Sequence, residues 1–129
     1  ILYAGQDKLQ GAALVLSAHT DLEDVRGAVQ DIGYRLTCER LCRAGNRWYV
    51  FFQAVPGQAS YTELERIVGP CLLHGDDPLL PGYAAWRHRV WSEKLAGLRT
   101  AREPDRPEIA RVEAILAAYA AMMKEDTSC

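Results

Sequence analysis

The chain has 129 residues, a formal net charge of −2 and an apolar content typical of globular proteins, so it fits one domain of ordinary size. No run approaches the roughly 20 apolar residues of a membrane-spanning helix, and no secretory signal peptide is visible. We therefore expect a cytoplasmic protein with no membrane segment.

The basic residues are concentrated in one segment. Residues 83–102 hold five Lys/Arg and one Asp/Glu, a net charge of +4, whereas residues 1–82 and 103–129 each carry −3. The five cations are Arg87, Arg89, Lys94, Arg99 and Arg102. This pattern indicates an anionic partner, although a solvated helix face is the commoner cause of such a run.

Cysteine and histidine are not spaced as metal ligands. The four cysteines, Cys38, Cys42, Cys71 and Cys129, form no CxxC pair, and the three histidines add no ligand spacing. A Cys38–Cys42 disulfide within one strand would be geometrically awkward. We expect reduced thiols and no metal site.

The first half of the chain reads as a helix end, a strand, a helix and a β-hairpin. Residues 1–9 resemble a helix end, and the apolar run at 12–17 predicts a strand buried on both faces, as in a parallel sheet. Thr20 or Asp21 is expected to cap the next helix, which Gly33 ends. The β-formers at 34–43 and 47–55, with turn residues between them, predict the hairpin.

Four aromatic residues stand close together in the second hairpin strand: Trp48, Tyr49, Phe51 and Phe52. They allow two interpretations. They could stack on bases, but consecutive aromatics in a strand more often fill the core on both faces of a sheet. We favour the core.

The second half predicts helices. Thr62 and Glu65 form a capping-box pattern for a short helix that Gly69 and Pro70 stop. Long helices are expected at 81–102 and 108–124, packed antiparallel because the turn between them is short. The second has a coiled-coil-like seam of Ile109, Val112, Leu116, Tyr119 and Met123. Between these parts, the apolar and glycine-rich segment 69–80 is expected to pack on the sheet.

Six short motifs together resemble the C-terminal half of the bacterial tRNA (adenine-22, N1)-methyltransferase family. They are Gly33-Tyr34-Arg35-Leu36, Glu39-Arg40-Leu41, Gly45-Asn46-Arg47-Trp48-Tyr49, Thr62-Glu63-Leu64-Glu65, Gly69-Pro70-Cys71-Leu72-Leu73 and Asp77-Pro78-Leu79-Leu80. The resemblance covers nearly the whole chain. It implies an α/β fold: residues 1–57 would be the C-terminal part of a doubly wound, Rossmann-like sheet, 58–80 a connector on that sheet, and 81–129 an antiparallel helical hairpin.

By this resemblance, residues 12–17 correspond to the fifth strand of the family's sheet. The hairpin corresponds to the sixth and seventh strands, and the seventh would run antiparallel at the edge of the sheet. The family uses S-adenosylmethionine, held by a glycine-rich turn that is absent here. The cofactor site would therefore lie in a missing N-terminal half, and this fragment alone would be inactive. An isoleucine at the first position fits such a fragment.

The resemblance implies tRNA as the partner and the five cations of residues 83–102 as its binding residues. Ser17 ends the buried strand and His19 follows it, where loops line ligand crevices, and both are substrate-side candidates. Family members carry Gln-Pro-Asn in place of Ser17-Ala18-His19, which puts substrate positioning in doubt. No catalytic residue is assigned. The alternative function is a non-enzymatic RNA- or protein-binding module derived from that fold. Under either function, an exposed sheet edge or the helical hairpin is a candidate surface for homo-oligomers.

Overall fold

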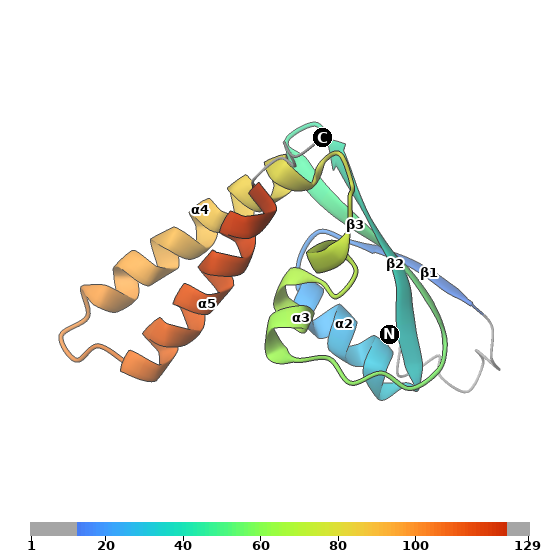
Figure 1. Cartoon of the computed structure of the whole chain (residues 1–129), viewed down its shortest axis with the longest axis horizontal. Coiled ribbons are helices and arrows are strands. Elements are labelled where there is room, and N and C mark those ends of the chain that lie inside the picture. The colour runs from blue at the N-terminus through green and yellow to red at the C-terminus, as the bar shows by residue number, and fades with distance from the viewer. Residues whose placement is uncertain (1–12, 124–129) are drawn as a thin grey trace. The chain divides into compact units, whose positions relative to one another are not determined.

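The computed structural model describes residues 13–123. In chain order the elements are β1 (Leu14–Ala18), α2 (Leu22–Asp31), β2 (Tyr34–Ala44), β3 (Arg47–Pro56), α3 (Glu63–Val68), the 3-10 helix η1 (Leu72–His74), α4 (Leu80–Arg99) and α5 (Arg106–Met123) (Figure 1). Among the described residues, those up to Asp77 form one compact unit, and those from Pro78 form a second. The predicted α/β class and helical hairpin are confirmed, while the helix end expected at 1–9 lies outside the described residues.

The first unit contains a three-stranded sheet in the order β1-β3-β2, with β3 antiparallel to both neighbours. The prediction that the last strand lies at the edge is therefore wrong. The tight turn at Gly45, whose φ is +61°, folds β3 back along β2. The other edge of β3 then pairs with all five residues of β1, so β3 is central among the described strands.

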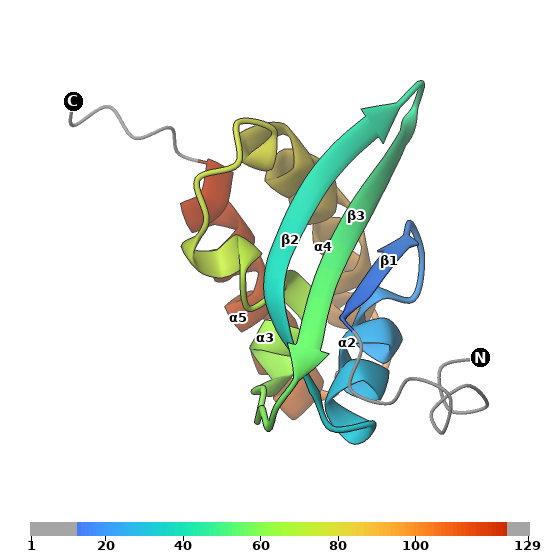
Figure 2. The ribbon, with the colours of Figure 1, turned by 90° about the vertical axis from the view of Figure 1, so that its right-hand side faces the viewer.

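The two faces of this sheet differ. Val50, Phe52 and Ala54, alternate residues of β3, are at most 1% exposed, and the Phe52 ring lies against Arg26 of α2. Figure 2 shows α2 on one face of the sheet. On the opposite face Val15 is 74% exposed and Phe51 is 43% exposed. The prediction that β1 is buried on both faces is wrong, as is the prediction that the β3 aromatics fill the core on both faces. In the described residues, the helices of this unit cover one face only.

Most of the predicted helix signals are present. Gly33 follows α2 with a φ of +83°. Thr62 and Glu65 form the predicted capping box at α3, each side chain accepting a bond from the other's backbone N–H, at 3.1 and 2.9 Å. The cap of α2 differs from the prediction, because Asp21 is left-handed, with a φ of +56°, and makes no side-chain capping bond.

A buried ion pair joins α2 to β2. Arg26 Nε donates to Glu39 Oε2 at 2.7 Å, and both side chains are fully buried. Arg26 Nη1 also donates to the carbonyl oxygens of Arg66 and Ile67, at 2.9 and 3.0 Å. These bonds satisfy carbonyl groups at the C-terminal end of α3, which has no further helical turn to accept them. The pair therefore fixes the end of α3 against α2 and β2.

The same pair holds the glycine-rich segment that follows α3. Glu39 Oε1 accepts bonds from the backbone N–H groups of Cys71 and Leu72, at 2.7 and 3.3 Å. Gly69 makes this approach possible, since its φ is +119° and a Cβ there would lie 2.8 Å from both Arg26 Nη2 and Glu39 Oε1. Further along, Asp77 Oδ2 accepts a bond from Leu41 N at 2.9 Å. The segment is thus held on β2 by polar contacts as well as by the buried Leu72.

The second unit consists of α4 and α5, which run antiparallel (Figure 1). The buried side chains of α5 are Val112, Ile115, Tyr119 and Met122. The predicted seam is right at Val112 and Tyr119, but Ile115 and Met122 replace Leu116 and Met123, and Met123 is 37% exposed. The predicted alternation of three- and four-residue steps is correct, but two seam positions lie one residue earlier than predicted. The helical period alone does not distinguish between two adjacent positions that both carry apolar residues.

Candidate nucleic-acid interface

Ser17 and His19, the predicted substrate-side residues, lie at the carboxyl end of β1 and are both exposed. Ser17 is opposite Phe51 on the sheet face that no described helix covers. The His19 ring lies 5.3 Å from the Tyr49 ring, centroid to centroid, at an angle of 59°. Beyond this point β2 and β3 continue past the end of β1 to their turn (Figure 2). The carboxyl end of β1 and the hairpin tip thus lie at the same end of the sheet.

The loop between His19 and α2 has an unusual backbone. Asp21 is the one non-glycine residue with a positive φ among residues 13–123. Asp tolerates the left-handed region better than most residues, and such conformations occur preferentially at functional sites. The conformation lies at the end of the sheet where α/β proteins bind ligands.

Four of the five predicted tRNA-binding cations lie on α4, and Arg102 follows the helix end. Two of them stack on tryptophans: Arg87 lies 5.3 Å from the Trp86 ring centre, and Lys94 lies 4.9 Å from that of Trp91. Stacking orders a cation without neutralising its charge, which leaves the charge available to an anion.

Two of the five cations also have carboxylate partners. Arg99 Nη2 lies 3.1 Å from Glu113 Oε2, and Lys94 Nζ lies 3.9 Å from Glu108 Oε1. The four side chains are between 27% and 55% exposed, so solvent weakens both pairs. Within the described residues, Arg87, Arg89 and Arg102 have no such partner. Next to Arg99, the turn between the helices bears a hollow of about 400 Å³, also lined by Arg106.

A second basic region, at the tip of the β2–β3 hairpin, was not predicted. Arg40, Arg43 and Arg47 are exposed there, and no Asp or Glu occurs between Glu39 and Glu63. The local excess of positive charge is visible in the sequence of this hairpin. The total charge of −3 over residues 1–82 masks it, because acidic residues elsewhere in that range outnumber the basic ones.

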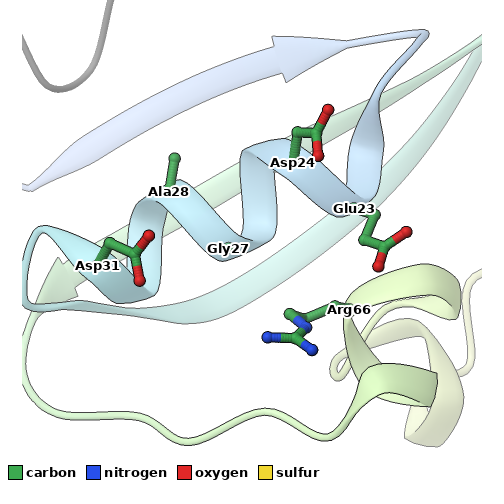
Figure 3. A pocket seen from close by; sticks show the side chains of 6 residues that line it. All are labelled: Glu23, Asp24, Gly27, Ala28, Asp31 and Arg66. Carbon is green, nitrogen blue, oxygen red and sulfur yellow. The ribbon is translucent and has the colours of Figure 1, made fainter.

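A groove of about 390 Å³ lies between α2 and α3. Figure 3 shows Arg66 reaching from α3 toward α2, and the other lining residues are Glu23, Asp24, Gly27, Ala28 and Asp31. Three carboxylates against one guanidinium make this groove unsuitable for a phosphate backbone. The acidic groove is therefore not a candidate for a nucleic-acid contact.

No group of three or more His, Cys, Asp or Glu side chains within residues 13–123 is placed to hold a metal ion. No helix of the described part is both long and apolar enough to cross a membrane.

At the level of sequence, no model of a known protein family matches the chain, and no curated protein matches it. Solved structures do match, and they establish the fold: it is similar to that of a protein of the Rossmann superfamily from Streptococcus agalactiae. That protein is 18% identical, with a TM-score of 0.74 over 95% of this chain and 53% of its own.

Two of the matching structures are of TrmK, and one of them is named as an m1A22 tRNA methyltransferase, the family that the sequence motifs resemble. The Bacillus subtilis m1A22 tRNA methyltransferase TrmK matches with a TM-score of 0.77 and 16% identity, over 96% of this chain and 57% of its own. M. capricolum TrmK, solved with S-adenosyl-homocysteine, matches with a TM-score of 0.61 and 11% identity, over 91% and 53%. At these identities the likeness establishes the fold. The chain spans about half the length of these structures.

Proposed function

We propose that this chain is the C-terminal part of an S-adenosylmethionine-dependent tRNA adenine N1-methyltransferase, and that α4 and α5 help to bind the tRNA. The observation that carries the proposal is the match of 96% of the chain to 57% of an m1A22 tRNA methyltransferase, with a TM-score of 0.77. The six sequence motifs support the same family independently of the fold.

The residues of this chain do not fit the cofactor. The loop after β1 reads Ser17-Ala18-His19-Thr20, and the sequence contains no Gly-x-Gly turn of the kind that holds S-adenosylmethionine. Cofactor binding is therefore assigned to a part of the protein outside this sequence, and we derive no chemical step through it. Within the described residues β1 pairs with β3 along one edge only, and its free edge supports a sheet that continues into that part.

The role proposed for this chain is to hold the substrate. The cations of α4 would contact tRNA phosphates, which gives affinity that depends on salt and little on sequence. The carboxyl end of β1 would lie beside the target nucleotide, because ligands of open α/β sheets bind at that end. Adenine N1 is inaccessible in a base pair, so the nucleotide must leave the stack to be methylated.

The proposed tRNA contact is tested by binding of the 129-residue chain to a tRNA transcript. Arg89 is exposed and has no carboxylate partner within the described residues, so Arg89→Glu should weaken binding at least fivefold without unfolding the helix. Arg35→Glu is the matched control, since Arg35 is also an exposed arginine but lies at the opposite end of β2 from the turn. Equal binding by both variants would overturn the role of α4.

A further inference from the structure

The tip of the β2–β3 hairpin is strongly basic. Three exposed arginines, Arg40, Arg43 and Arg47, lie on either side of the turn at Gly45 and Asn46. The 23 residues from Arg40 to Thr62 contain no acidic side chain. A charge of +3 on a projecting hairpin is a local feature of a chain whose net charge is −2.

The hairpin cations are not used to stabilise the fold through ion pairs. Arg26, by contrast, is buried and bonded to Glu39, and Arg99 contacts Glu113. Within the described residues, Arg43 and Arg47 have no carboxylate partner. Arg43 lies over the Trp48 ring, 5.1 Å from its centre, which orders the side chain and leaves its charge uncompensated.

An aromatic pair lies at the base of this tip. Ala18, the last residue of β1, is opposite Val50, so His19 lies beside the first residues of β3. There its ring contacts that of Tyr49, and the His19 side chain remains exposed. Arg47 is two residues before Tyr49 on β3. The exposed His19 ring, the half-buried Tyr49 ring and Arg47 are therefore neighbours on the uncovered face of the sheet, while Arg43, opposite Trp48, lies on the other face of the same tip.

We propose that this hairpin tip is a second RNA contact, in which Arg43 and Arg47 hold backbone phosphates and an unpaired base stacks on His19. The inference rests on the proposed function. It adds a second RNA-binding surface in the unit that ends at Asp77, whereas α4 belongs to the unit that begins at Pro78. Cations for phosphates combined with an exposed ring for a base are the features by which proteins bind unpaired nucleotides. An acidic protein partner would use the arginines but would not require the exposed ring.

The phosphate contact is tested with Arg47→Gln in the 129-residue chain, by titrating a labelled tRNA transcript at several salt concentrations. Arg47 is exposed and makes no cation–π contact with any residue of the described range, so its loss should leave the thermal unfolding of the chain unchanged. The inference predicts binding weakened about threefold or more, and a slope of log affinity against log salt that is lower by about one. Arg35→Gln, the control at the far end of β2, should match the wild type.

The stacking contact is tested with His19→Ala on a short single-stranded RNA and on its duplex. The variant should bind the single strand at least fivefold more weakly and the duplex as the wild type does, because duplexed bases are not free to stack on a side chain.

Three outcomes would overturn the inference. If the wild type binds tRNA while Arg47→Gln and Arg35→Gln bind equally well, the tip is no RNA contact and the proposed function stands. If His19→Ala affects the single strand and the duplex alike, the base-stacking role fails. If the wild type binds no tRNA at all, the inference fails together with the tRNA-binding role of the chain.

Discussion

Arg26 and Glu39 form a fully buried ion pair, with 2.7 Å between Arg26 Nε and Glu39 Oε2. Each partner has further bonds, Arg26 to two carbonyl oxygens of α3 and Glu39 to the N–H groups of Cys71 and Leu72. The pair therefore connects α2, β2, α3 and the segment after α3. A buried charge is tolerated only when it is compensated in this way.

Removal of one partner should be far more damaging than removal of both. Arg26→Met or Glu39→Leu leaves an unpaired buried charge and should lower the free energy of unfolding by about 3–5 kcal/mol. The double variant should lose much less than the two single losses added together, because neither charge remains. Urea unfolding of the four proteins measures the coupling. Additive losses would show that the two side chains act independently.

Gly69 should not tolerate a side chain. Its φ of +119° is unfavourable for other residues, and a Cβ would lie 2.8 Å from Arg26 Nη2 and Glu39 Oε1. Gly69→Ala should therefore destabilise the chain by at least about 2 kcal/mol. Gly27→Ala in α2 is the control: nothing lies within 4 Å of its added Cβ, and it should stabilise by about 0.5–1 kcal/mol. Similar melting temperatures for both variants would contradict the packing described.

Cys71 should be an unreactive thiol at neutral pH. Burial, followed by the nearby Glu39 carboxylate, raises the pKa of Cys71 from 9.0 to about 11. Because the folded chain holds this proton more tightly than the unfolded chain, its contribution to stability is complete below pH 9 and is lost as the pH rises through about 11. Iodoacetamide labelling followed by peptide mass analysis should find Cys71 unmodified at pH 8 in the native chain and modified in urea. Rapid native labelling at pH 8 would be inconsistent with this pKa.

Glu113 should weaken RNA binding in the wild type. Its carboxylate lies 3.1 Å from Arg99 Nη2, and both side chains are about half exposed, so the pair adds little stability. Glu113→Gln removes a negative charge and frees Arg99, which should raise tRNA affinity about two- to fivefold. Glu23→Gln, in the acidic groove of the other unit, removes the same charge and should change nothing. If Glu113→Gln leaves binding unchanged, Arg99 is not an RNA contact.

Local signals predicted much of the fold. The hairpin, the glycine after α2 and the capping box of α3 each depend on a few adjacent residues, and all three are present. The central place of β3 was not predictable in this way, because it depends on pairing between β1 and residues more than thirty positions later. Arg26 was also missed. An arginine within an amphipathic helix reads as a surface residue until its partner Glu39 is known.

The candidate site was predicted in part. Ser17 and His19 lie at the expected end of β1, and the basic residues of 83–102 lie on or just after α4. Tyr49 was assigned to the core because aromatics are usually buried, and only the strand register shows that it faces outward beside His19. The ion pairs of Lys94 and Arg99 depend on how α5 packs on α4, which periodicity does not determine.

The most direct test of the account is methyl transfer by the protein expressed from the complete reading frame that encodes this chain. The protein would be incubated with labelled S-adenosylmethionine and an unmodified tRNA transcript, and the product nucleosides would be separated. The account predicts labelled N1-methyladenosine, and none from a transcript whose target adenine is replaced by guanine. Binding of the tRNA without any methylation would contradict the enzymatic assignment and leave a binding module with the fold of half a methyltransferase.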